Sequence, residues 1–327
     1  MGTPVDPTPE FIQKAFQEAS NSPSYPVTVG TPELREAITA WAKKYLGATG
    51  DFGVLPLIGS KEFVAWLPTF IEAQSVLYPD VAYPTYLVGS LLAQAEATAV
   101  SLDAISWPHA DMAWVNSPSN PTGRVHSESE FKAAIEWSRK NKSVVVSDEC
   151  YLEFGDSVTP TSILNYTGGD NTNILAVHSL SKRSSMAGYR AAFIVGDPAL
   201  IARILEVRKH AGMMVPLPVQ VAMVAALSDD AHVAEQRARY NSRRATLTPA
   251  LRAAGFTIEN SEAGLYIWAT RNENCWDSVS WLADLGIIAT PGVFYGDLGA
   301  SHIRIAMTAT DAQISEAATR IMNKVSA

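Results

Sequence analysis

Lys182 lies in the segment Ser179-Leu180-Ser181-Lys182, directly after an apolar run, and Arg190 follows eight residues later. A neutral lysine amine forms Schiff bases with carbonyl compounds and accepts protons, and a nearby arginine binds anionic groups. Alone, this segment is also typical of a solvated basic loop between two strands. Its chemical interpretation therefore depends on the other polar segments of the chain.

Four such segments occur. Asn116–Gly123, with the sequence Asn-Ser-Pro-Ser-Asn-Pro-Thr-Gly, follows a predicted strand and is also typical of a plain turn. Ser147–Tyr151 follows the next strand and contains Asp148, an acid that could instead cap a helix or face solvent. Gly59-Ser60-Lys61 begins a predicted helix, and a helix N-terminus attracts anions when it is not simply capped. Arg304 lies inside an apolar strand, where a buried guanidinium needs either an internal salt bridge or a bound anion.

The predicted elements place these segments at the ends of strands. One helix is predicted at 31–46, with Thr31 and Pro32 at its start, and a second at 59–74. A third begins at the capping box formed by Ser127 and Glu130 and ends near Asn141, and a fourth ends near His210. Apolar strands alternate with these helices at 112–115, 144–146, 174–177 and 192–195. Unbroken apolar strands between helices are typical of a mostly parallel sheet covered on both faces, with functional residues at the carboxyl ends of the strands.

The C-terminal third has a different pattern. Strands are predicted at 256–258, 265–269, 286–289 and 303–307, with helices that begin near Trp276 and Asp311. We therefore expect an α/β fold with a large domain, in which helices sandwich a mostly parallel sheet, and a smaller α+β domain.

Composition excludes several classes of protein. The 327 residues suffice for about two domains, and 47% apolar with 18% charged residues is an ordinary globular balance. The net charge of −8 argues against nucleic-acid binding. No apolar run reaches the ~18 residues of a membrane span, and no signal peptide is evident, so the cytoplasm is expected. Two cysteines and scattered histidines predict neither a disulfide framework nor a metal site.

Taken together and in this order, the segments resemble the fold-type I, class I/II aminotransferases, which use pyridoxal 5′-phosphate, over essentially the whole chain. The motifs that carry the resemblance are Asn120-Pro121-Thr122-Gly123, Asp148 with Tyr151, and Ser179–Lys182 with Arg190. The resemblance implies a large cofactor-binding domain at residues 21–234 and a small domain made of residues 1–20 and 235–327. It also implies two half-reactions with an amino acid and a 2-oxo acid as substrates.

The resemblance further implies a role for each site residue. Lys182 forms the Schiff base with the cofactor and then serves as general base and acid. Asp148 keeps the ring nitrogen protonated, while Asn120 and Tyr151 donate to the phenolic oxygen of the ring. The phosphate is expected to bind Arg190, Ser179 and the helix start at Gly59, Ser60 and Lys61.

Four more residues have implied roles around the substrate and the second subunit. Tyr86 is expected to stack on the cofactor ring, with core packing as its alternative. Arg304 is expected to bind the substrate α-carboxylate, with Asn120 and the backbone of Gly2 beside the substrate. Tyr25 is expected to reach the phosphate of the other subunit, which predicts a homodimer with shared active sites. The Gly-Thr-Pro motif, which the family precedes with a further segment, begins here at Gly2, so that segment is expected to be missing.

The variant of the lysine loop at 182–190 and the segments 2–9 and 208–220 resemble actinobacterial N-succinyldiaminopimelate aminotransferases. The expected substrate is then N-succinyl-L,L-diaminopimelate, exchanged with 2-oxoglutarate in lysine and diaminopimelate synthesis. Arg183, Lys209 and His210 are candidates for binding this acidic substrate, or solvated surface residues. Alternatives are an aspartate, aromatic or alanine aminotransferase, a cysteine-S-conjugate β-lyase, or a non-enzymatic effector domain of the same fold. A dehydrogenase is disfavoured because the Gly-x-Gly-x-x-Gly loop is missing.

Overall fold

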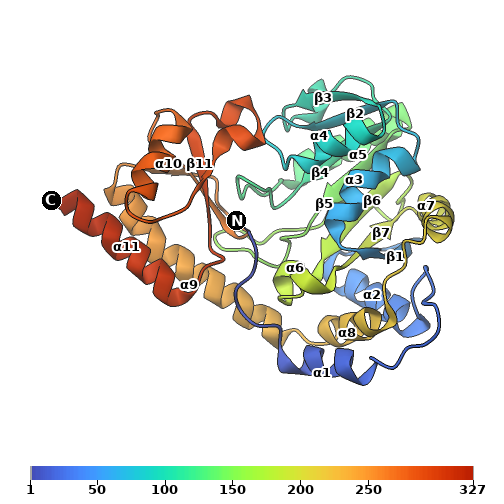
Figure 1. Ribbon diagram of the computed structural model, residues 1–327. Coiled ribbons are helices and arrows are strands. Elements are labelled where there is room, and N and C mark those ends of the chain that lie inside the picture. Colours follow the sequence, from blue (N-terminus) through green and yellow to red (C-terminus); the bar gives the residue numbers. More distant parts are fainter. Residues whose placement is uncertain (1, 327) are drawn as a thin grey trace.

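A computed structural model describes residues 2–326, and a seven-stranded sheet forms the centre of its larger part (Figure 1). The strands lie in the order β1 (Gly53–Ile58), β7 (Ala191–Gly196), β6 (Ile174–Ser179), β5 (Val144–Asp148), β4 (Met112–Asn116), β2 (Ser75–Pro79) and β3 (Glu96–Val100). Parallel pairing joins β3, β2, β4, β5 and β6, whereas β7 is antiparallel to both β6 and β1. The prediction of a mostly parallel sheet is confirmed.

Helices cover both faces of this sheet. Those that contribute to one core are α1 (Glu10–Glu18), α2 (Pro32–Tyr45), α5 (Glu128–Asn141) and α8 (Leu217–Leu227). Those that contribute to the other are α3 (Ser60–Phe70), α4 (Thr85–Leu92) and α7 (Pro198–His210). Val145 and Val146 of β5 belong to opposite cores. The strand reads as an unbroken apolar run because neither face of the sheet meets water.

The smaller part is a four-stranded antiparallel sheet packed against helices. Its strands lie in the order β10 (Thr290–Pro291), β11 (His302–Ala306), β9 (Tyr266–Thr270) and β8 (Thr257–Glu259). The core beside this sheet draws side chains from α9 (Ala231–Ala253), α10 (Cys275–Ala283) and α11 (Asp311–Ser326). Short 3-10 turns are η1 (Ala104–Ser106), η2 (Ile163–Tyr166), η3 (Ala187–Tyr189), η4 (Gly292–Tyr295) and η5 (Asp297–Gly299). No helix among residues 2–326 is long and apolar enough to cross a membrane.

Local signals in the sequence fix several helix starts. The Thr31 hydroxyl accepts a hydrogen bond from the backbone N–H of Leu34 at 3.2 Å, and Ser127 and Glu130 form the predicted capping box. The strand predicted at 286–289 is wrong. Gly286 has φ +70°, and its N–H donates to the carbonyl of Ala283, the last residue of α10. This apolar stretch is therefore the turn that ends α10 and the loop after it, not a strand. The helix predicted at 59–74 ends earlier, at Phe70.

The division of the chain between the two parts also differs from the prediction. Residues 1–20 were expected in the small domain, but α1 packs against α8 at the bottom of Figure 1 and buries Ile12 in a core of the large part. The boundary predicted between residues 234 and 235 falls inside α9. This helix continues from the large part into the core of the small part, where Tyr240 and Leu251 are buried.

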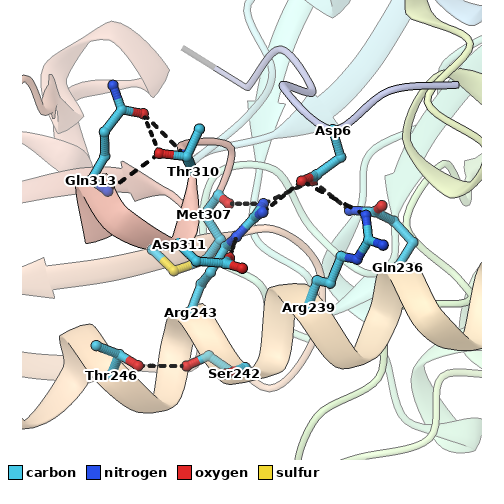
Figure 2. Close-up of polar contacts among 10 residues, drawn as sticks. All are labelled: Asp6, Gln236, Arg239, Ser242, Arg243, Thr246, Met307, Thr310, Asp311 and Gln313. Carbon is cyan, nitrogen blue, oxygen red and sulfur yellow. Dashed lines mark hydrogen bonds and ion pairs between the residues drawn. The ribbon is translucent and has the colours of Figure 1, made fainter. Parts of the chain in front are cut away.

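Residues 2–9, here called the N-terminal strap, run from α1 toward the space between the two parts (Figure 1). Figure 2 shows how Asp6 fastens the strap to α9. The Asp6 carboxylate accepts hydrogen bonds from Arg243 at 2.6 and 2.8 Å and from Gln236 at 2.9 Å. Arg243 also donates to Asp311, at the start of α11, at 2.6 Å. One buried guanidinium therefore holds the strap, α9 and α11 together.

Two ion pairs link α7 to the α3 region and provide a matched test of burial. Arg208 is fully buried and donates to Glu62 at 2.7 and 3.0 Å, whereas the Arg203–Glu72 pair, at 3.1 Å, is exposed. We expect Glu62→Ala to lower the free energy of unfolding by about 3–5 kcal/mol, because it leaves a buried charge unpaired. Glu72→Ala should cost about 1 kcal/mol or less.

Chemical denaturation of both variants, at one protein concentration, measures the difference. Equal losses of stability in the two variants would show that burial of the Arg208–Glu62 pair is not what makes it important.

Candidate active site

A cavity of about 530 Å³ lies at the carboxyl ends of β4, β5 and β6, where residues of the small part and the strap close it. Ten of the predicted site residues line it: Gly2, Ser60, Lys61, Asn120, Asp148, Tyr151, Ser179, Lys182, Arg190 and Arg304. The topology explains this gathering, because the carboxyl ends of parallel strands meet at one edge of a sheet.

Lys182 lies in α6 (Leu180–Arg183), a single helical turn that follows β6 directly. The Ser179 hydroxyl caps this turn by accepting a hydrogen bond from the N–H of Ser181 at 3.2 Å. Burial, chiefly, lowers the pKa of Lys182 to about 8; Cys150 opposes this shift, and the positive charges of Arg190 and Arg304 add to it. A substantial fraction of this amine is therefore neutral, and hence nucleophilic and basic, near physiological pH.

Asp148 ends β5 and lies buried at the cavity wall. Its carboxylate accepts hydrogen bonds from the Tyr86 hydroxyl at 2.9 Å and from the backbone N–H of Cys150 at 3.2 Å. Burial nevertheless raises the pKa of Asp148, since these hydrogen bonds offset the loss of hydration only in part. A cationic partner at this position would keep the carboxylate ionised.

The position of Tyr86 corrects the sequence prediction. Its ring is fully buried and stacks on Trp114, with the ring centres 5.0 Å apart, and it does not line the cavity. Its hydroxyl instead supports Asp148 from behind. Tyr83, which precedes α4 and lies edge-on to Tyr86, lines the cavity wall instead. In this segment, Tyr83 rather than Tyr86 is therefore the residue available to a ring in the cavity.

An anion cradle forms where α3 begins. Gly59, with φ +76°, is the N-cap of α3, and a Cβ there would lie 2.1 Å from a terminal nitrogen of Arg190. Only glycine therefore allows the guanidinium to come this close to the helix start. The hydroxyls of Ser60, Ser179 and Ser181 and the amine of Lys61 line the same cavity. A helix N-terminus, a guanidinium and several hydroxyls together make a site for a phosphate dianion.

Arg304 enters the cavity from β11 of the small part. Its guanidinium donates to Asn120 at 2.6 Å and lies over the rings of Tyr266 and Tyr295, 4.1 and 5.0 Å from their centres. Within residues 2–326, no carboxylate forms an ion pair with it. Asn120 is held in turn by Asn116, whose side chain accepts from the Asn120 N–H at 2.8 Å and donates to the carbonyl of Asp148 at 2.9 Å.

The remaining predicted residues lie in different places. Gly2 touches Tyr266 so closely that a Cβ there would lie 2.2 Å from its hydroxyl. Tyr25 is 92% exposed and lies outside the cavity. Arg183 is buried and pairs with Glu153 at 2.5 Å. Neither it, nor Lys209, which pairs with Glu206, nor His210 lines the cavity, so the structure does not support their candidacy as substrate-binding cations.

Sequence reasoning missed several aromatic residues of the site. Tyr83 lies in the same Tyr83-Pro84-Thr85-Tyr86 segment as Tyr86, and the local sequence does not distinguish the two. Tyr266 and Tyr295 come from the small part, and only its pairing with the large part brings them to Arg304. No local pattern marks them.

The donor set fits pyridoxal 5′-phosphate. The cradle at Gly59–Lys61 and Arg190 suits its phosphate, and the incompletely stabilised Asp148 carboxylate suits a protonated ring nitrogen. The Lys182 amine suits its aldehyde. The Arg304 guanidinium, without a carboxylate partner in the described chain, then remains for the carboxylate of an amino acid.

Comparisons with known proteins agree with this interpretation. The model of the family described as aminotransferase class I and II matches residues 2–321. The chain is 51% identical to the 4-dedimethylamino-4-oxo-anhydrotetracycline transaminase OxyQ of Streptomyces rimosus, over 98% of this chain and 91% of that protein. It is also 51% identical to the "probable aminotransferase Rv1178" of Mycobacterium tuberculosis, over 98% of this chain and 79% of that protein.

A solved structure supports the same grouping. The "probable N-succinyldiaminopimelate aminotransferase" of Thermus thermophilus superimposes with a TM-score of 0.90 at 26% identity. The match covers 99% of this chain and 93% of that one.

The lowered pKa of Lys182 predicts a measurable reactivity. In protein freed of any bound carbonyl compound, acylation of Lys182 by brief pulses of acetic anhydride should reach half its maximal rate near pH 8, because only the neutral amine reacts. In the urea-denatured chain the same residue should titrate near ~10.4. Peptide mass spectrometry measures both. A midpoint in the folded protein equal to that in the denatured chain would contradict the effect of burial.

Proposed function

Because this chain belongs to the class I and II aminotransferases, which use pyridoxal 5′-phosphate, we propose that it transfers the amino group of N-succinyl-L,L-diaminopimelate to 2-oxoglutarate. The reaction would serve lysine and diaminopimelate synthesis in the cytoplasm. The observation that carries the proposal is the placement of Arg304, a buried cation without a carboxylate partner in the described chain, in the same cavity as the Lys182 amine. A carboxylate-bearing amine is the substrate that such a pair accepts.

In the proposed mechanism the side chains of the cavity divide the work. Pyridoxal phosphate, when bound, supplies an electron sink that makes the Cα proton of the amino substrate acidic. Lys182 Nζ accepts that proton and later returns one, and its pKa of about 8 suits both directions near neutral pH. Asp148 would keep the ring nitrogen protonated, and Tyr151 and Asn120 would donate to the phenolic oxygen. Arg304 orients the substrate by its α-carboxylate.

Binding is assigned to the remaining residues. Arg190, Ser179 and the start of α3 at Gly59, Ser60 and Lys61 would hold the phosphate, and Tyr83, rather than Tyr86, would cover the ring. Gly2 brings the strap backbone beside the substrate. Since a side chain at this position would meet the Tyr266 hydroxyl, the strap needs glycine there to approach the cavity so closely.

Charge supports an acidic substrate. The residues that line the cavity include the cations Lys61, Lys182, Arg190 and Arg304 and a single acid, Asp148. The chain as a whole carries a net charge of −8, so the cavity is a local exception that attracts anions. The name of the Thermus thermophilus protein supports N-succinyldiaminopimelate in particular.

A second candidate is an aromatic polycyclic ketone as amino acceptor. The name of the Streptomyces rimosus relative specifies such a compound. The cavity favours it through an aromatic wall made of Tyr83, Phe294 and Tyr295, in which Phe294 is 56% exposed. Flat rings stack favourably on walls of this kind.

A panel of amino donors tests the assignment. We expect N-succinyl-L,L-diaminopimelate to give a higher kcat/KM than acetylornithine or aspartate, each with 2-oxoglutarate. Lys182→Ala should reduce turnover roughly 10²–10⁴-fold, which ties the activity to this site.

Three outcomes would reject the substrate. One is a clear preference for acetylornithine or aspartate, and another is turnover that requires a polycyclic aromatic ketone with glutamate as donor. The third is release of pyruvate and ammonia from cystathionine without an oxo acid, which would identify a β-lyase.

We also propose that the enzyme is a homodimer with shared active sites. The support is an apolar row on α4, where Leu87, Val88, Leu91 and Leu92 are 38–63% exposed. Exposed apolar rows of this kind mark interaction surfaces. The row begins next to Tyr83 and Pro84 of the cavity wall, so a second copy packed on it would lie beside the site. Tyr25 is free to contact such a copy.

Substitution in this row should dissociate the dimer. We expect Leu91→Glu to shift the sedimentation coefficient from that of a dimer to that of a monomer at micromolar concentration. Dimer formation would bury the new carboxylate against apolar side chains, which is costly. Ile105→Glu, at an 85% exposed position in η1, is the control and should leave the dimer intact. A monomeric unmodified protein would refute the proposal.

A further inference from the structure

Two phenol groups meet between the large and small parts. The hydroxyls of Tyr151, which follows β5, and Tyr266, which begins β9, lie 3.0 Å apart, and both rings are buried. The rings themselves are edge-to-face with centres 5.6 Å apart. Both residues line the cavity, so a hydroxyl hydrogen that is not engaged in the hydrogen bond between them is available to a ligand there.

A count of protons limits what this pair offers. Burial raises the pKa of both phenols, so each keeps its proton at neutral pH. Each hydroxyl has one hydrogen, and the hydrogen bond between them uses one of the two. The pair therefore presents a single hydroxyl hydrogen to the cavity. Which tyrosine presents it depends on which phenol is the stronger donor.

The surroundings make Tyr266 the stronger donor. After burial, the positive charge of Arg304 has the largest effect on the pKa of Tyr266, and it lowers that pKa. The Arg304 guanidinium lies directly over the Tyr266 ring, 4.1 Å from its centre, and makes no such contact with the Tyr151 ring in the described chain. The more acidic phenol donates, so Tyr266 donates to Tyr151, and the Tyr151 hydrogen faces the cavity.

Tyr266 is also fixed from several sides. Its ring lies under the Arg304 guanidinium at 4.1 Å, and its carbonyl accepts a hydrogen bond from Arg244 at 2.9 Å. Gly2 of the strap packs against its hydroxyl. A phenol held in this way cannot turn away from Tyr151 without displacing the strap or the substrate-binding arginine.

We propose that Tyr266 is a positioning residue that acts through two others: its hydroxyl directs the hydrogen of Tyr151 toward the cofactor, and its ring holds Arg304 for the substrate carboxylate. The proposal rests on the roles given above to Tyr151 and Arg304. The hydroxyl and the ring of Tyr266 have different roles in this proposal, and a substitution can remove the hydroxyl alone or the hydroxyl together with the ring.

The hydroxyl is tested in the holoenzyme by titrating the visible absorption of bound pyridoxal phosphate against pH. A hydrogen bond to the phenolic oxygen favours the deprotonated chromophore. We expect Tyr266→Phe to raise the chromophore pKa by about 0.3–1 unit, since hydrogen bonds in a chain strengthen one another. In a Tyr151→Phe background the same change should have no further effect. Tyr295→Phe is the control, since Tyr295 also lies against Arg304 but is not bonded to Tyr151.

The ring is tested by the dissociation constant of glutarate, a dicarboxylate without an amino group, measured by its effect on the same absorption. Tyr266→Phe should change it less than about twofold, whereas Tyr266→Leu should weaken binding roughly 2- to 30-fold through the lost cation–π contact. Equal weakening by both variants would overturn the role of the ring.

The role of the hydroxyl is overturned by an unchanged titration in Tyr266→Phe, or by a shift of equal size when Tyr151 is already phenylalanine. These spectra need only bound cofactor and a non-reacting acid. A wrong assignment of the amino donor would therefore leave them intact, and the two proposals fail separately.

Discussion

Desolvation at the carboxyl edge of the sheet is the constraint on which the rest of the site depends. Helices on both faces and the small part above remove water from the ends of β5 and β6. The same burial lowers the pKa of Lys182 and raises the pKa of Asp148, Tyr151 and Tyr266. Each group is thereby moved toward its neutral form, which makes the amine reactive and makes the acid depend on a bound cation.

The two parts of the chain contribute different functional groups to this desolvated edge of the sheet. The large part supplies the lysine, the acid and the anion cradle on rigid strand ends and helix starts, whereas the small part supplies Arg304 and its aromatic neighbours. Neither part holds a complete site. The contact between Arg304 and Asn120 at 2.6 Å is where the two sets join, so packing of the parts and assembly of the site are the same event.

The sequence predicted a mostly parallel sheet and most of the polar residues that line the cavity. It could do so because many of these residues follow strands that are buried on both faces, and such strands are unbroken apolar runs, as at Val144–Val146. It failed where tertiary packing decides. Tyr83 and Tyr86 have equivalent local patterns, and only the turn into α4 sends one to the cavity and the other under Asp148. Arg183 reads as a loop cation but is drawn into a core beside Trp41. The small-part aromatics carry no sequence signal.

The N-terminal strap sets a limit on how far the two parts can separate. Asp6 is bonded to Arg243 of α9, which in turn binds Asp311 of α11, while the Thr8 hydroxyl donates to the carbonyl of Ser185, beside the lysine turn, at 2.7 Å. Only Pro7 stands between these anchors, and two steps of a fully extended chain span less than about 8 Å. While both contacts hold, the strap can allow the cleft to open by only a few ångströms at this point.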